Sequence, residues 1–154
     1  MAVVMKLDNV PTEKRYEGNE GWITRLFVEE DGAVRNAKDF GVMIQDAKVG
    51  SIPQDKKLHF HRKQETLYYV LSGRCIVNVE GKEHELGPNF AIWIPPKVKH
   101  GLTKVLEDLM MLEVVTNPKH FSDIVESNRP WYREYPNSGV SDQPVRKNPG
   151  SNSR

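Results

Sequence analysis

The stretch HFHRKQETLYYVLSG, residues 59–73, decides the fold that we expect for this chain. Two histidines separated by one residue begin it, and the strand-length segment Thr66–Leu71 follows and ends at a Ser72-Gly73 turn signal. Alternate side chains of a strand point to the same face, so His59 and His61 are expected to project together. The stretch therefore predicts two successive strands, the first with two imidazoles on one face.

Similar strand-length segments lie on both sides of this stretch. They are rich in β-branched and aromatic residues, and turn signals such as Asp31-Gly32, Glu80-Gly81 and Pro95-Pro96 separate most of them. The segments are 22–28, 40–45, 57–61, 66–71, 74–80, 82–86, 90–94, 100–103 and 109–115. Many short strands at this spacing predict an all-β fold, either a sandwich or a barrel.

The two ends of the chain differ in composition from this central part. A short C-terminal helix is predicted over 118–127, with Asn117 as N-cap and Pro118 at the first helical position. We therefore divide the chain into a polar N-terminal arm (1–21), a barrel (22–127) and a Pro-rich tail (128–154), with 137–154 expected to be disordered. Three aromatic residues of the tail are expected to pack on the barrel, a dimer contact or a lid being the alternatives: Trp131, Tyr132 and Tyr135.

Composition excludes several classes of protein. With 22 Lys+Arg against 21 Asp+Glu, the 154 residues carry a net charge of +1, so no nucleic-acid partner is expected. A single cysteine, Cys75, excludes a disulfide scaffold, fits a reducing cytoplasmic compartment and is expected to be a small buried hydrophobe. The longest apolar run, Phe90–Pro96, is far shorter than the roughly 20 residues of a membrane span. A small molecule is the expected partner.

Four side chains are candidate metal ligands. His59 and His61 have the spacing of a chelating pair, and Glu65 would add an oxygen near the same edge. His100 lies far along the chain and can close the set from an opposed strand. Imidazole with carboxylate suits a divalent transition metal, Fe, Mn, Ni, Co or Zn, and the residues do not choose among them. The two remaining histidines, His84 and His120, are interpreted as surface residues.

Two motifs in this pattern resemble those of the cupin family. The run 59–73 resembles the first cupin motif, in which two His and a Glu precede a strand that ends in Gly. The run GPNFAIWIPPKVKHG, residues 87–101, resembles the second, in which a Pro-containing strand leads to a fourth ligand, His. The resemblance covers about residues 40–116. It implies a cupin double-stranded β-helix, a jelly-roll barrel, with a metal in one mouth and frequent dimerisation, so that a homodimer is expected.

The chain departs from the family pattern at three places. The ligand Glu usually stands one residue closer to the closing Gly, where this chain has Thr66. Either Glu65 ligates through a bulge, or the site has only three His; we favour Glu65 because bulges are common at barrel rims. Asn89 and Lys97 stand where the family commonly has Gly, and Lys104 lies where an Asn often follows the last His.

The register at Glu65 also decides which tyrosine faces the predicted site. If Glu65 points inward, Tyr69 shares its parity and is the candidate catalytic proton donor. If Thr66 sets the register, Tyr68 takes that place. A core tyrosine with a satisfied hydroxyl is the alternative for either residue.

The function predicted from these residues is that of a metal-dependent cupin enzyme. It would act on a small polar hydroxy-carbonyl or carboxylate substrate by isomerase, epimerase or lyase chemistry, in which the ion polarises an oxygen and a Tyr or Glu moves a proton. The alternatives are an Fe(II)-dependent dioxygenase and a non-catalytic small-molecule-binding cupin. The same candidate ligands serve all three.

Overall fold

Strands form almost all of the regular structure. The computed structural model describes residues 1–14, 20–54, 56–117, 119 and 124–126. Its elements are η1 (Leu7–Asn9), β1 (Thr12–Lys14), β2 (Trp22–Val28), β3 (Gly41–Ala47), β4 (His59–His61), β5 (Thr66–Val79), β6 (Lys82–Leu86), β7 (Ala91–Ile94), β8 (His100–Val115) and β9 (Ile124–Glu126). The predicted all-β fold is confirmed. No helix in the described part of the chain is long and apolar enough to cross a membrane.

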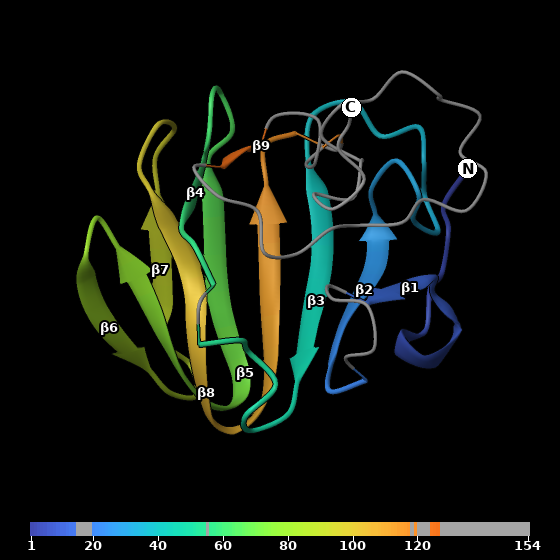
Figure 1. The fold of residues 1–154 in the computed structure, drawn as a ribbon. Coiled ribbons are helices and arrows are strands. Elements are labelled where there is room, and N and C mark those ends of the chain that lie inside the picture. Colours follow the sequence, from blue (N-terminus) through green and yellow to red (C-terminus); the bar gives the residue numbers. More distant parts are fainter. Residues whose placement is uncertain (15–19, 55, 118, 120–123, 127–154) are drawn as a thin grey trace, which may run out of the picture.

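The strands join into one antiparallel sheet that curls around the core (Figure 1). One path through it runs β1-β2-β3-β8-β4-β9, and β5 adds β6 and β7 to the other side of β8. β1, which lies within the predicted N-terminal arm, pairs with β2 at the start of this path. The central ladder joins β5 to β8 from Thr66↔Val115 to Val79↔His100, so it brings the two predicted motifs together.

The two longest strands replace pairs of shorter ones expected from the sequence. β5 continues through the Ser72-Gly73 signal, and β8 continues through Asp108. The ladder between them shifts register at Ser72 and Arg74, and both strands bend at this end of the sheet (Figure 1). Gly73 has φ +84°, a left-handed conformation that favours glycine, and a Cβ there would lie 2.1 Å from the Asp108 carbonyl oxygen. A bulge at a close backbone approach thus forms the bend.

The curled sheet encloses a largely apolar core. Every second residue of β2 is buried, as alternation predicts. Cys75 is fully buried, as expected from the sequence, and burial raises the pKa of its thiol to about 12. The largest apolar contributions are Trp22, Leu26, Met43, Tyr68, Ile94, Leu109 and Met111.

The prediction of a short C-terminal helix over 118–127 is wrong for the described residues 124–126, which form a strand. Ile124–Glu126 form β9, which pairs with β4 through His59↔Glu126 and His61↔Ile124. Asn117 does accept a hydrogen bond from the Lys119 amide (2.9 Å), which is the local turn that the N-cap signal predicted. Hydrogen bonds to the edge of β4 prevail over the helix signal further along. The rest of the predicted helix and the whole tail, with its three aromatic residues, lie outside the described residues.

Candidate metal centre

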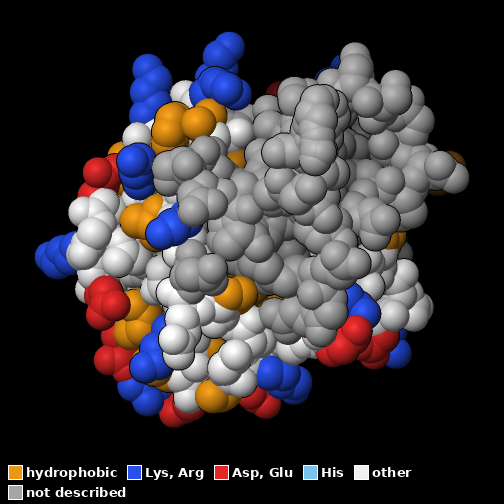
Figure 2. Space-filling view, in the orientation of Figure 1, with side chains coloured by type: hydrophobic (Ala, Val, Ile, Leu, Met, Phe, Trp, Pro, Cys, Tyr) orange, Lys and Arg blue, Asp and Glu red, His pale blue; other side chains and the backbone are white. Residues whose placement is uncertain are grey.

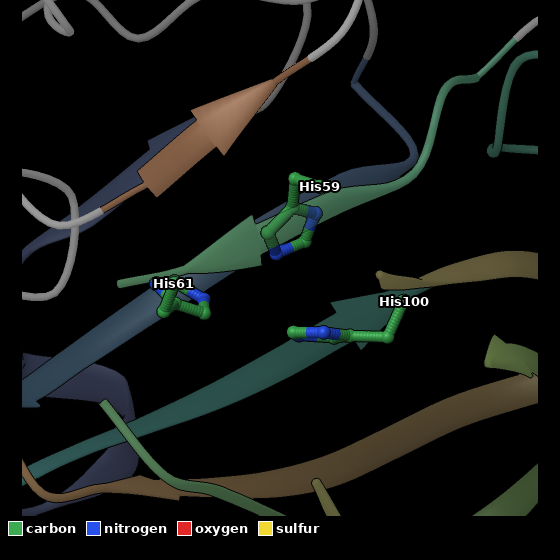
Figure 3. Close-up of side chains that lie close together, drawn as sticks. All are labelled: His59, His61 and His100. Atoms are coloured by element: carbon green, nitrogen blue, oxygen red, sulfur yellow. The ribbon is translucent and has the colours of Figure 1, made fainter. Parts of the chain in front are cut away.

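Three histidines from two strands meet inside the curled sheet. His59 and His100 are direct antiparallel partners, and His61 follows on the same face of β4. Ring centroids lie 5.1 Å (59–61), 4.5 Å (59–100) and 5.5 Å (61–100) apart, and Figure 3 shows the imidazoles turned toward one another. All three side chains are buried. Of the other histidines, His84 is partly exposed on β6 and His120 lies outside the described residues.

The three imidazoles fit a shared transition metal ion. One nitrogen from each ring lies within 4.8 Å of the others. Two nitrogens that bind one ion at about 2.1 Å each can be at most about 4.2 Å apart, so the observed spacing is close to that of a metal site. His100 Nδ1 is 2.8 Å from the Val98 carbonyl oxygen and therefore carries the proton. Its Nε2 is buried and makes no hydrogen bond to the described residues, so its lone pair is in place for a metal.

His100 is also held in its neutral form. Burial is the main cause that lowers its pKa to about 4; the hydrogen bond to Val98 opposes this effect and the charge of Lys56 adds to it. Since imidazole must be neutral to bind a metal, this ring is ready as a ligand at pH 7.

The loop before β8 is tied to the strand that carries the histidine pair. The Lys97 amide donates to the His61 carbonyl oxygen over 2.7 Å. Lys97 (φ 69°) and Asn89 (φ 68°) both adopt the left-handed conformation that suits the Gly of the family pattern. The turn geometry is thus kept without glycine, at a conformational cost of roughly 1–2 kcal/mol for the lysine.

The structure does not bring Glu65 into the cluster, so the register favoured from the sequence is wrong. The Glu65 side chain is exposed on the outer face and accepts a hydrogen bond from Trp93 Nε1 (3.0 Å). Thr66 is buried instead, and its hydroxyl oxygen accepts from Gln64 Nε2 (3.1 Å). The loop between β4 and β5 shifts the alternation by one residue relative to His61. The group of possible ligands among the described residues is therefore three histidines.

The same change of register exchanges the positions expected for the two tyrosines. The Tyr69 hydroxyl, the expected catalytic group, is on the outer side and donates to Asn89 Oδ1 (2.9 Å). Tyr68 is buried, with its ring centroid 6.1 Å from that of His100. The structure therefore places Tyr68 beside the histidines, which is the alternative that the Thr66 register gives.

A buried polar stripe crosses the same inner face and was missed by sequence reasoning. Gln45 Oε1 accepts from Trp22 Nε1 (2.8 Å) and Thr24 Oγ1 (2.9 Å), and its Nε2 donates to Glu113 Oε2 over 2.7 Å. Glu113 is in turn the cross-strand partner of Tyr68. The parity of Glu113 with buried neighbours in LMMLEVV is a sequence signal that could have identified it.

A lysine near His100 was also missed. Lys56 is half-buried, and its Nζ lies 6.0 Å from the centroid of the buried Trp22 ring. A Cβ built at Gly101 would be 2.8 Å from the same nitrogen. The ammonium group therefore packs beside the backbone that follows His100.

Comparison with known sequences finds a family model that matches the central part of the chain. Residues 49–115 match the model described as Cupin domain. An uncharacterized protein of Methanocaldococcus jannaschii is 33% identical over 48 residues, which make up 31% of this chain and 38% of that protein. The chain thus matches well under half the length of this curated relative.

Several solved structures have a similar fold, and some of them are named as enzymes. Pac13 of Streptomyces, described as a nucleoside dehydratase and solved with uridine, has a TM-score of 0.64 at 13% identity, covering 83% of this chain and 92% of its own. Oxalate decarboxylase of Bacillus subtilis has a TM-score of 0.58 at 16% identity, covering 77% and 31%. KdgF of Halomonas sp. has a TM-score of 0.52 at 16% identity, covering 76% and 88%. At these identities the likeness concerns the fold.

Proposed function

Because residues 49–115 match the Cupin domain model, we propose that the chain is a cupin and a metal-dependent enzyme that acts on a small polar substrate by lyase or isomerase chemistry. The observation that carries the proposal is the convergence of three buried imidazoles beside an inward-facing tyrosine, Tyr68. An ion bound there would supply Lewis acidity toward a carbonyl, hydroxyl or carboxylate oxygen of the substrate.

The residues of the chain have distinct roles in this proposal. His59, His61 and His100 would hold a divalent ion through neutral nitrogens, so these ligands would offset none of its charge. Tyr68 is the proton donor to the leaving or enolic oxygen, because its ring lies beside His100. Glu113, its cross-strand partner, is the group that receives a proton from substrate. The hydrogen bond from Gln45 fixes the orientation of that carboxylate.

Two findings bear on the reaction class. The dehydratase named among the similar folds is a lyase, which supports elimination chemistry on the same scaffold. The ligand group without a carboxylate favours the second candidate, an Fe(II)-dependent dioxygenase, since neutral three-histidine sites occur among cupin-like dioxygenases. A metal analysis, followed by aerobic and anaerobic assays on hydroxy-carbonyl and nucleoside substrates, separates the two. Turnover that requires oxygen would replace the lyase proposal by the oxygenase.

Tyr68→Phe tests the proposed catalytic group. Removing the phenolic proton should lower turnover by about 100-fold or more, which is the usual contribution of a positioned acid, while bound metal stays unchanged. Tyr69→Phe is the matched control, since the Tyr69 hydroxyl bonds Asn89 on the outer side and should leave turnover within twofold. Equal rates for the two variants would contradict the role of Tyr68. A metal-loaded protein that binds these compounds but turns over none of them would be a binding cupin.

The predicted homodimer also has a candidate surface. Four large apolar side chains on and beside the outer face of β5 and β7 are exposed: Leu67, Leu71, Phe90 and Trp93. Leu67 and Trp93 are cross-strand neighbours, so the patch is contiguous there. We place the dimer contact on this patch, because large exposed apolar patches usually mark interfaces. Leu67→Lys should shift the sedimentation coefficient from dimer to monomer, and a wild-type protein that is already monomeric would refute the assignment.

A further inference from the structure

The loop before β8 is fixed on both sides of the residue that holds the His100 imidazole. Val98 is that residue, because its carbonyl oxygen lies 2.8 Å from His100 Nδ1. On one side of it the Lys97 amide donates to the His61 carbonyl oxygen, and on the other side Lys99 is bonded to the turn between β5 and β6. The position of the Val98 carbonyl group therefore depends on two contacts, of which the second lies on a hairpin outside the histidine cluster.

The contact between this turn and Lys99 uses a side chain in place of the backbone. The β5–β8 ladder ends with Val79↔His100, so Glu80 and Lys99 are next in register. In a hydrogen-bonded antiparallel pair the two residues exchange both N–H···O bonds. The Glu80 amide does donate to the Lys99 carbonyl oxygen (2.8 Å), but the return bond from the Lys99 amide ends on the Glu80 carboxylate, at Oε1 (2.7 Å). The carboxylate thus extends the ladder by one bond toward Val98.

Glu80 makes this contact from a backbone conformation that suits other residues better. Glu80 and Gly81 are the two residues between β5 and β6, and both have positive φ, 53° and 87°. Two-residue turns of this kind favour Asn or Asp followed by Gly, because most side chains are strained in left-handed backbone. Strained residues persist where surrounding contacts hold them, and they cluster at functional sites. The contact to Lys99 is therefore a reason to look for a role of Glu80 in the nearby cluster.

We infer that Glu80 is a positioning residue of the proposed metal centre and acts on His100 through Lys99 and Val98. The inference rests on the proposed function, because His100 is a ligand only if the cluster binds an ion. By holding the Lys99 amide, the carboxylate keeps the Val98 carbonyl oxygen against Nδ1 of the imidazole. The proton then stays on Nδ1, and Nε2 keeps its lone pair for the ion.

This role requires the reach of the Glu80 side chain and not its charge. Glu80 is exposed, and acidic and basic side chains are interspersed on the side of the molecule where β6 lies (Figure 2). Water and salt screen such exposed charges over roughly 8–10 Å. Glutamine keeps the length and an acceptor oxygen, so it should replace Glu80. Asparagine is one methylene group shorter and should not reach the Lys99 amide.

Glu80→Asn tests the inference, because it should affect stability and metal binding differently. Asparagine suits the left-handed turn, which offsets the lost hydrogen bond, so the urea midpoint should stay at that of wild type. The affinity for cobalt(II), measured by competition with a chromophoric chelator, should fall roughly 10-fold, the lower end of the range for residues that support a ligand. Glu80→Gln should stay within twofold of wild type. Glu83→Ala, which removes an exposed carboxylate of β6, is the matched control for charge and should also stay within twofold.

The tautomer of His100 gives a second readout that needs no metal. In metal-free protein at neutral pH, where His100 is uncharged, ¹⁵N NMR should place its proton on Nδ1 in wild type and Glu80→Gln, and on both nitrogens in turn in Glu80→Asn. The inference is overturned by an unchanged tautomer or cobalt affinity in Glu80→Asn, or by an equal loss of affinity in Glu80→Gln. A lower urea midpoint in Glu80→Asn would also overturn it, because Glu80 would then only stabilise the fold. Failure of wild type to bind cobalt would refute the metal centre instead, and the tautomers would still decide on Glu80.

Discussion

His61→Ala is expected to lower the affinity for a divalent transition metal by roughly 100-fold or more, since even residues that only support a ligand commonly contribute 10–100-fold. His61 is 1% exposed and is one of only three possible ligands in the described group. A competition titration with a chromophoric chelator measures the loss. The far-UV circular dichroism should remain that of a β protein, because the core is largely apolar and distributed over the whole sheet.

Two further variants make this result specific to the cluster. His84→Ala removes a partly exposed imidazole on β6 and should leave metal affinity unchanged. Glu65→Gln should also leave it unchanged at every pH, because the Glu65 side chain is exposed and a glutamine can still accept the hydrogen bond from Trp93. A large loss in Glu65→Gln would restore the carboxylate as a ligand. Full metal occupancy in His61→Ala would show that the ion binds elsewhere.

Much of the fold and of the candidate site could be predicted from local patterns. The strands 22–28 and 82–86 were predicted with the bounds that the structure has, because turn signals flank alternating residues there. The convergence of the three histidines followed from the period of two in β4 and from a second motif placed on an opposed strand. The strand bounds and the convergence of the histidines depend on neighbours in sequence or on motif order, so both can be predicted from the sequence alone.

The errors in the predicted site arise where the alternation of inward and outward side chains shifts by one residue. Counting in steps of two from His61 puts Glu65 inward, but the buried series is Gln64, Thr66 and Tyr68 because the loop after β4 shifts it by one. A second shift at the bend of β5 moves the buried set from Val70 to Cys75 and Val77. Loops and bulges change the inward face without leaving a mark in composition. Glu113 and Lys56 were missed for another reason: their contacts are with strands and loops that lie far away in sequence.

Substitution of Gly73 at the bend of β5 is expected to lower the stability of the protein strongly. Gly73→Ala should destabilise the protein by about 2–5 kcal/mol, the sum of a left-handed alanine and a steric overlap within the sheet. Gly73 has φ +84°, and its added Cβ would meet the Asp108 carbonyl oxygen at 2.1 Å and the Glu107 carbonyl oxygen at 2.9 Å. Both neighbours are backbone atoms of the paired strand, so neither can move aside without breaking the ladder between β5 and β8.

Gly50→Ala and Gly81→Ala separate the two components of that effect. Both glycines also have positive φ, +79° and +87°, but no atom lies within 4 Å of a Cβ built at either position. They should therefore lose only the conformational part, about 1–2 kcal/mol. Urea unfolding of the three variants gives the comparison, and the midpoint of Gly73→Ala should lie clearly below the other two. Three equal midpoints would mean that the β5–β8 ladder rearranges at its bend to make room for a side chain at residue 73. The close approach of Gly73 to the Asp108 backbone would then not be what requires glycine at this position.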